Sequence, residues 1–508
     1  MTETRRESRA TPDHPEPAAV AWRSLAAVAA TVAVVLLGFA SRYGYHRDEL
    51  YFLRAGEHLA FGYADQPPLT PLLARLASTV FGDSLVGLRV VPAVVAGLVV
   101  LVTGVLAAEF GAGRGAQVLA AGATAASAVL LAVGHLLSTS TVDLLVWTVL
   151  SWLVVRALRR GGWRWLLVGL VAGIGLQNKT LVAFLLVALG VGLLLVGPRE
   201  VLRTRWFWLA VGLALVLWAP YLVWQASHGW PQLELARAIA AGGSGTSAPA
   251  WLFVPYQFVL VSVFLVPVWA VGLWQLATAP RLRRFRVFAV AYVVLVVVFL
   301  ITGGKPYYLA GLYPVLLAAG SGPVLHRARA GPGRGRAALP WVAVGLAAVT
   351  SAVLFLPVVP VRYLAATPIV DINYDAGETV GWPAFVRTVA RVHADLPADE
   401  RAGAIVLTRN YGEAGAVDRY RAELGLPPVY SGHNGYWYWG PPPEETGTTI
   451  VVGHRPETLS RWFGSVRLAA RIDNGVGVAN EEQGAPVWVC RERRATWTQL
   501  WPQLRYLG

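Results

Sequence analysis

Cysteine is nearly absent from this chain of 508 residues, because Cys490 is the only one. A single thiol excludes an internal disulfide and any metal site built from several cysteines. The sequence also lacks a phosphate-binding loop of the form GxxxxGK followed by Ser or Thr, and it lacks a GxGxxG turn between a strand and a helix. A nucleotide-dependent enzyme of either common type is therefore not indicated.

Charged residues are scarce as well, at 14% against 56% hydrophobic residues. This composition excludes an ordinary soluble protein and is typical of a chain that lies mostly within a membrane. Of the 29 acidic residues, 13 precede Arg362 and 16 follow it, although the second part is far shorter. An apolar body therefore precedes a polar tail of roughly domain size.

Lysine is the rarest basic residue, because 41 of the 43 basic residues are Arg and only Lys179 and Lys305 are Lys. The net charge of +14 would suit a nucleic-acid partner. The arginines of the first part, however, cluster between apolar runs, where basic residues orient membrane proteins. We therefore predict membrane lipids, and no nucleic acid, among the partners.

Eleven apolar runs predict transmembrane helices of about 20 residues. They lie at about 26–40, 88–109, 116–136, 142–158, 164–178, 181–197, 206–225, 252–276, 287–302, 307–325 and 340–360. The turns near 137–141 and 178–181 are the weakest divisions and could instead be breaks within re-entrant segments. Residues 22–361 thus predict an α-helical polytopic membrane protein with about 11 transmembrane helices.

Three segments outside these runs have their own predicted character. Residues 1–21, rich in Arg and Pro, predict a disordered cytoplasmic N-terminus. Residues 42–87 form the first outer loop and contain two short amphipathic helices, at 48–60 and 69–81. The outer loop at 242–249 predicts a mobile lid.

Basic residues in the short loops set the orientation. With a cytoplasmic N-terminus, the inner segments hold 20 basic residues and the outer segments before residue 361 hold eight. We therefore expect a multi-pass protein of the plasma membrane whose polar tail lies outside the cytoplasm. The same topology brings Asp48, Glu49, Lys179 and Lys305 together on the outer side.

The tail, residues 362–508, predicts a soluble extracytoplasmic α/β domain. Short apolar runs rich in β-branched residues predict buried strands; they lie at 404–408, 449–453 and 487–490. Residues 382–396 and 413–424 have the apolar spacing of helices. Between these elements lies an aromatic stretch that contains Tyr436, Trp437 and Trp439.

The adjacent carboxylates of Asp48 and Glu49 are the first candidates for chemistry. Charges at the edge of a bilayer are costly, and packing does not explain them. One carboxylate would remove a proton from an acceptor hydroxyl. The alternative is a solvated loop in which the acidic pair has no role.

Three further outer features favour an anion or a buried charge. Lys305 lies beside Tyr307 and Tyr308 at the start of a predicted helix, where an ammonium, phenol donors and the helix dipole all favour a phosphate. Lys179 lies in a similar place, and Asp143 is a carboxylate within a predicted span. The alternatives are snorkelling lysines, an aromatic belt, and a helix-capping or first-turn role for Asp143.

Together, the outward site and the missing nucleotide motifs indicate an activated substrate that is dissolved in the membrane. Its phosphate would lie at the level of the outer headgroups. Polyprenyl-phosphate sugars fit this description.

The sequence resembles the membrane glycosyltransferases of the GT-C fold. The resemblance is greatest to the bacterial dolichyl-phosphate-mannose-protein mannosyltransferases, the glycosyltransferase family 39 type, a group that includes aminoarabinose transferases acting on lipid A. It covers residues 22–360 and is much weaker over the tail. The matching stretches are 45–51 with 65–69, 135–143, 175–180 and 305–312.

This resemblance implies roles for individual residues. It implies catalysis by Asp48, with Glu49 in support. It implies binding of the donor phosphate by basic and tyrosine residues, which are Lys305, Tyr307, Tyr308 and Lys179. Supporting residues would be Asp143, His46 and Gln66. Relatives of the aminoarabinose type have a basic residue where this chain has Gln66, so donor identity or phosphate recognition is expected to differ.

The implied reaction is a direct displacement at the anomeric carbon with inversion, in which Asp48 accepts the proton of the acceptor. The acceptor is left open between protein, lipid and cell-wall glycan, and the donor sugar between hexose and pentose. We predict no cofactor; a divalent ion at Asp48 or Glu49 stays an alternative that ligand spacing does not indicate. Tyr436, Trp437 and Trp439 would stack on acceptor sugars, or pack the tail against the membrane or the helices.

Two other functions compete with this one. A transporter or flippase of lipid-linked or cell-envelope substrates would show repeated halves or charges near the middle of the membrane, and the sequence shows neither. A non-catalytic assembly or sensor protein would leave the outer carboxylates and lysines without a role.

Overall fold

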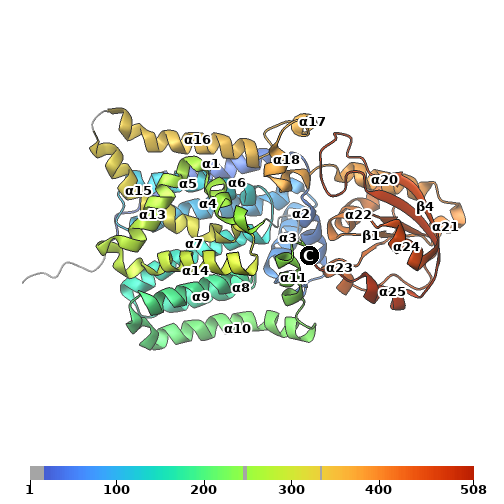
Figure 1. Ribbon diagram of the computed structural model, residues 1–508, viewed down its shortest axis with the longest axis horizontal. Coiled ribbons are helices and arrows are strands. Elements are labelled where there is room, and N and C mark those ends of the chain that lie inside the picture. The colour runs from blue at the N-terminus through green and yellow to red at the C-terminus, as the bar shows by residue number, and fades with distance from the viewer. Residues whose placement is uncertain (1–15, 244–248, 332–333) are drawn as a thin grey trace, which may run out of the picture.

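The computed structural model describes residues 16–243, 249–331 and 334–508. The molecule is elongated, with a helical bundle at one end and a part that contains a β-sheet at the other (Figure 1). Most of the predicted disordered N-terminus and most of the predicted lid at 242–249 lie outside the described residues.

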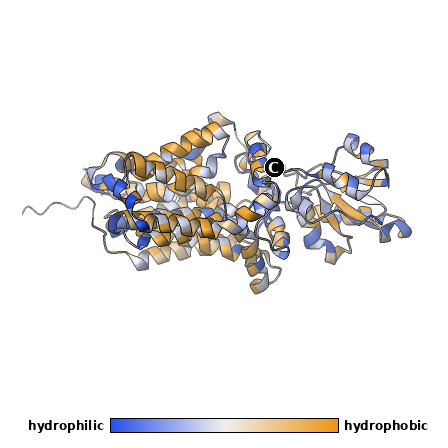
Figure 2. Ribbon diagram, turned by 90° about the horizontal axis from the view of Figure 1, so that it is seen from below, coloured by the Kyte–Doolittle hydropathy of each residue, from blue (hydrophilic) through white to orange (hydrophobic). Residues whose placement is uncertain are grey.

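The bundle consists of helices whose residues are mostly hydrophobic, as Figure 2 shows. They are α1 (Trp22–Phe39), α4 (Leu85–Glu109), α5 (Arg114–Ala126), α6 (Ala128–His135), α7 (Thr139–Arg160), α8 (Arg164–Leu176), α9 (Leu181–Leu195), α10 (Arg205–Ser227), α12 (Phe253–Val261), α13 (Val266–Thr278), α14 (Val287–Thr302), α15 (Tyr313–Ala330) and α16 (Leu339–Phe355). Turns of 3₁₀ helix join several of them, among them η4 (Pro280–Phe285) and η5 (Pro306–Leu312).

Fewer helices are long and apolar enough to cross a membrane than the sequence predicts. Within the described residues six helices can cross a membrane, or up to eight if each of two bent pairs is one span. Three predicted spans coincide with α8, α9 and α14, which have 13, 15 and 16 residues. These helices are shorter than the roughly 20 residues that a span needs, so eleven spans stay a prediction.

Two helices of the first outer loop lie between the bundle and the sheet (Figure 1). They are α2 (Arg47–Glu57) and α3 (Leu69–Phe81), close to the predicted ranges. The backbone N–H of Asp48 donates to Nδ1 of His46 at 3.2 Å, and the N–H of His46 donates to the carboxylate of Glu49 at 2.9 Å. This reciprocal capping fixes the start of α2.

The C-terminal part has a five-stranded sheet in the order β2-β1-β3-β5-β4. The strands are β1 (Ile405–Thr408), β2 (Val429–Ser431), β3 (Thr449–Val452), β4 (Phe463–Arg471) and β5 (Pro486–Arg493). β1 pairs with β2 and β3 in parallel, and β5 pairs with β3 and β4 antiparallel. Strands are present at all three predicted positions, which are those of β1, β3 and β5; β2 and β4 are additional.

Helices cover both faces of this sheet. One face packs against α20 (Trp382–Ala394) and α22 (Tyr411–Leu424), and the other against α24 (Pro456–Trp462) and α25 (Trp497–Leu504). The remaining α-helices among the described residues are short: α11 (Pro231–Ala240), α17 (Val361–Leu364), α18 (Ile369–Ile372), α19 (Tyr374–Gly377), α21 (Ala398–Ala402) and α23 (Gly435–Tyr438).

The core beneath α20 and α22 continues into the first outer loop. Leu50, Phe52 and Ala74 from α2 and α3 belong to the same buried cluster as Val386 and Val417 from the C-terminal part. Apolar burial is the main stabilising term in such a contact. The C-terminal part therefore shares one core with α2 and α3, and it holds α2 in place.

Candidate active site

A cavity of about 380 Å³ lies where the bundle, α2 and the C-terminal part meet. One stretch of its wall is apolar and comes from α6, α12 and α16. The polar stretch comes from both parts of the molecule and consists of His46, Arg47, Asp48, Ser138, Ser140, Tyr256, Lys305, Tyr307, Asp371, Asn373, Tyr374, Asp375 and Tyr411. A site with both kinds of wall suits a ligand that has a polar head and an apolar body.

Asp48 is a half-buried wall residue of this cavity. Its Oδ1 accepts a hydrogen bond of 2.7 Å from the phenol of Tyr411, the first residue of α22. Its neighbour Arg47 pairs with Glu378 at 3.2 Å and with Glu481 at 2.7 Å, both in the C-terminal part. The C-terminal part therefore contacts both the candidate base and the residue before it in the first turn of α2.

Glu49 lies outside the cavity wall and is fully buried. Arg89 of α4 donates to its two oxygens at 3.1 and 2.8 Å. The backbone N–H groups of Leu137 and His46 donate to the same carboxylate at 3.0 and 2.9 Å. Because four donors already occupy its oxygens, the geometry supports a positioning role for Glu49, which ties α2 to the bundle.

The two lysines approach the cavity at different depths. Lys305 lines the cavity and is 9% exposed. Lys179 lies behind the wall, because its Nζ donates to Oγ of the wall residue Ser140 at 2.9 Å and is 5.3 Å from the ring centre of Tyr307. Burial and the nearby Lys179 lower the pKa of Lys305 to about 8, although Asp48 and Asp375 oppose that shift. Lys305 is therefore a cation at neutral pH, close to two carboxylates.

Asp143 and Tyr308 do not line the cavity. Oδ1 of Asp143 accepts a hydrogen bond of 3.0 Å from Nε1 of Trp147. The cap of α7 is Ser138, and no acidic residue lies in the first turn of that helix, so neither helix-terminus interpretation describes Asp143. The ring of Tyr308 lies 5.5 Å from Nζ of Lys179 and packs against Tyr307.

His46 and Gln66 occupy different surroundings. Nε2 of His46 lies 3.5 Å from Oδ1 of Asp375, so the two side chains form one polar patch of the wall. Gln66 is 3% exposed, and within the described residues neither polar atom of its side chain has a hydrogen-bond partner. A buried amide without partners is costly, which is consistent with a role in binding.

The aromatic stretch lies in the contact between the C-terminal part and α2. Tyr436 is buried, and its phenol donates to Asp418 at 2.9 Å. Trp439 stacks on His58 with ring centres 4.6 Å apart, and Nε1 of Trp437 donates to the carbonyl of Trp501 at 2.9 Å. None of the three aromatic residues lines the cavity, so the geometry fits the packing alternative better than sugar stacking.

The sequence interpretation did not single out Tyr411, Tyr374 or Asp375. A signal for Tyr411 is present, because Asn410 and Glu413 form a capping box at the start of α22. The residues that follow a parallel strand often carry function, and Tyr411 follows β1. Tyr374 and Asp375 lie in a short connecting helix, α19, that has no comparable signal.

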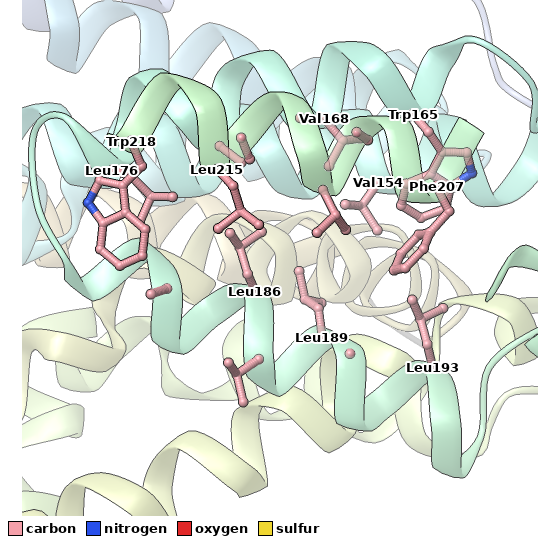
Figure 3. A pocket seen from close by; sticks show the side chains of 18 of the residues that line it. Val154, Trp165, Val168, Leu176, Leu186, Leu189, Leu193, Phe207, Leu215 and Trp218 are labelled. Atoms are coloured by element: carbon pink, nitrogen blue, oxygen red, sulfur yellow. The ribbon is translucent and has the colours of Figure 1, made fainter. Parts of the chain in front are cut away.

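A second pocket, of about 340 Å³, lies among α8, α9 and α10, and it is lined only by aliphatic and aromatic residues and glycines. Figure 3 shows Leu176 and Trp218 at one end and Trp165, Phe207 and Leu193 at the other. Its walls suit hydrocarbon rather than charged groups. Because Leu176 is three residues from Lys179, this pocket begins close to the polar site.

Residues 65–224 match the sequence model of the dolichyl-phosphate-mannose-protein mannosyltransferase family. No curated protein matches the chain in a sequence search. Similar solved structures include ArnT from Cupriavidus metallidurans, bound to undecaprenyl phosphate, with a TM-score of 0.56 and 16% identity over 92% of this chain and 97% of that chain. ArnT in the apo state gives a TM-score of 0.54 and 15% identity over the same shares of the two chains.

The arabinofuranosyltransferase AftD from Mycobacteria also matches, with a TM-score of 0.51 and 15% identity over 95% of this chain. The match covers 41% of AftD, so this chain spans less than half of that protein's length. At such identities these likenesses show the fold, and the family match comes from the sequence itself. The chain is a multi-pass membrane protein with the GT-C fold of these glycosyltransferases, and residues 65–224 match the dolichyl-phosphate-mannose-protein mannosyltransferase family.

Proposed function

We propose that the enzyme transfers a sugar from a polyprenyl-phosphate carrier to a hydroxyl group of an extracytoplasmic acceptor, with inversion at the anomeric carbon. The observation that carries this proposal is the presence of Asp48 and Lys305 on the walls of one cavity. A carboxylate can accept a proton there, and an ammonium can neutralise a phosphate. The undecaprenyl phosphate in the ArnT structure supports the class of donor.

In the proposed reaction the acceptor oxygen bonds to the anomeric carbon as the bond from that carbon to the phosphate oxygen breaks. Asp48 accepts the acceptor proton as a general base. The departing phosphate keeps the bonding electron pair, and Lys305 and the phenol of Tyr307 stabilise its charge. Lys179 adds a second positive charge from behind the Tyr307 ring.

The proposals for the sugar, the acceptor and the orientation in the membrane come from the sequence. The sugar is a hexose or a pentose, and the acceptor is a protein, a lipid or a cell-wall glycan. The excess of arginines on the predicted inner loops supports a cytoplasmic N-terminus and an extracytoplasmic C-terminal part in the plasma membrane. Neither the family match nor the fold supports the transporter alternative.

Measurements of donor binding and of turnover test the separate roles proposed for Lys305 and Asp48. Lys305→Gln should raise the Kd for the polyprenyl-phosphate sugar by about tenfold or more, because a charge-assisted contact is lost. Asp48→Asn should leave that Kd within about twofold and abolish transfer, because a general base contributes mainly to the chemical step. Asp83→Asn, an exposed substitution in the same outer loop, is the matched control and should change neither quantity. The proposal fails if Lys305→Gln binds the donor as the wild type does while Asp48→Asn still turns it over.

A further inference from the structure

Another polar cavity, of about 670 Å³, is lined by the turn between α4 and α5, the segment from α13 to η4, and the last turns of α15. Figure 1 shows α13 and α15 in the part of the bundle that is remote from the sheet. Four arginines line this cavity, namely Arg114, Arg281, Arg327 and Arg329, and its lining contains no Asp or Glu.

No carboxylate in the described residues forms an ion pair with any of these four arginines. Glu109, the acidic residue just before the turn between α4 and α5, already pairs with Arg159 and Arg156. Like charges that gather around one cavity without a counter-charge repel one another. All four arginines are exposed, and an anion bound among them would offset their mutual repulsion.

The first turn of α5 adds to this positive charge. Its N-cap residue, Gly113, has no side chain to accept from the free backbone N–H groups of the turn. A Cβ at Gly115 would lie 3.0 Å from Nη2 of Arg329, so that guanidinium lies against the positive end of the helix dipole. An anion in contact with both groups would remove this repulsion.

The helix dipole explains the positions of only two of the four arginines. Arg327 and Arg329 lie in the last turn of α15, where the helix dipole favours cations. Arg114 lies at the opposite kind of helix end, and Arg281 lies in the 3₁₀ turn η4. These two arginines have no such local stabilisation, so they carry the argument for a ligand.

We propose that this cavity binds the phosphate headgroup of an anionic membrane lipid. Arginine forks match phosphate oxygens, and basic pockets between transmembrane helices take such headgroups. The remaining wall includes Phe110, Leu282 and Leu325, which can contact the start of an acyl chain. This site is separate from the sugar-transfer cavity, which lies at the other end of the bundle.

Native mass spectrometry of the full-length protein in detergent tests the proposal, with dioleoylphosphatidylglycerol and dioleoylphosphatidylcholine as probes. The wild type should bind the anionic lipid at least about tenfold more tightly than the neutral one. The double variant Arg114→Gln/Arg281→Gln should lose most of that preference. The double variant Arg203→Gln/Arg205→Gln is the matched control, because both residues are exposed and lie outside the cavity lining, and it should keep the preference.

Arg329→Lys gives a second, milder variant that keeps the charge and loses the planar fork, and it should weaken phosphatidylglycerol binding by a smaller factor. Unfolding temperatures establish that each variant is folded. Equal binding of the two lipids by the wild type, or an equal loss in the control variant, would overturn the proposal. Displacement of phosphatidylglycerol by millimolar inorganic phosphate would overturn the lipid assignment in favour of a soluble anion.

Discussion

The phenol of Tyr411 donates a hydrogen bond of 2.7 Å to Oδ1 of Asp48, although 363 positions separate the two residues in the sequence. The bond joins the C-terminal part to the residue that we propose as the catalytic base. Tyr411 can hold this position because Gly415, one helical turn later, packs against the backbone of Leu50 in α2. The C-terminal part therefore completes the candidate active site.

Removal of this phenol should lower the rate of transfer. In Tyr411→Phe the carboxylate of Asp48 loses a hydrogen bond that holds its orientation, so kcat should fall by about tenfold. Tyr420→Phe is the control on the same helix, because its phenol forms no hydrogen bond within the described residues, and it should keep the wild-type rate. An unchanged kcat in Tyr411→Phe would show that the contact does not act on the base.

Lys305 should set the alkaline limit of donor recognition. Its pKa is lowered to about 8 by burial and by Lys179, so the cation is present below that pH and is lost above it. A plot of kcat/KM for the donor, which reports ionisations of the free enzyme, should therefore fall above about pH 8. Lys305→Arg keeps its charge to a much higher pH, so its profile should stay level there. A fall at the same pH in both enzymes would exclude Lys305 as the titrating group.

The ion pair between Glu49 and Arg89 should matter for stability. Both side chains are buried, with 0% and 1% exposure, and removal of one partner leaves an unpaired buried charge. Glu49→Ala or Arg89→Met should therefore lower the free energy of unfolding by about 3–5 kcal/mol.

The double variant Glu49→Ala/Arg89→Met should recover part of that loss, because no unpaired charge remains. The measurement is thermal unfolding of the detergent-solubilised protein, followed by tryptophan fluorescence. A single variant as stable as the wild type would contradict the positioning role of Glu49.

Local sequence signals predicted much of the fold. The amphipathic pattern of α2 and the apolar runs of β1, β3 and β5 depend on neighbouring residues alone, and the structure has these elements near the predicted positions. β4 was not predicted, because it is an edge strand whose residues are mostly exposed or half-buried. β2 has only three residues, too few for a periodic pattern.

The candidate site was only partly predictable, for a physical reason. Asp48, Lys305 and Tyr307 could be grouped because membrane topology places outer loops together. Topology does not say which side chain faces a cavity, so the adjacent Asp48 and Glu49 were treated as a pair. The contacts of Asp48 with Tyr411, and of His46 with Asp375, arise from tertiary packing across more than 300 residues.

The most direct test of the central claim is transfer of labelled sugar from a panel of polyprenyl-phosphate sugars by the purified protein. The wild type should transfer label from at least one donor, and Asp48→Asn should lower kcat by about 100-fold or more. Asp83→Asn should keep the wild-type rate. Transfer by Asp48→Asn at the wild-type rate would contradict the account. A wild-type protein that binds no donor of the panel would contradict it as well.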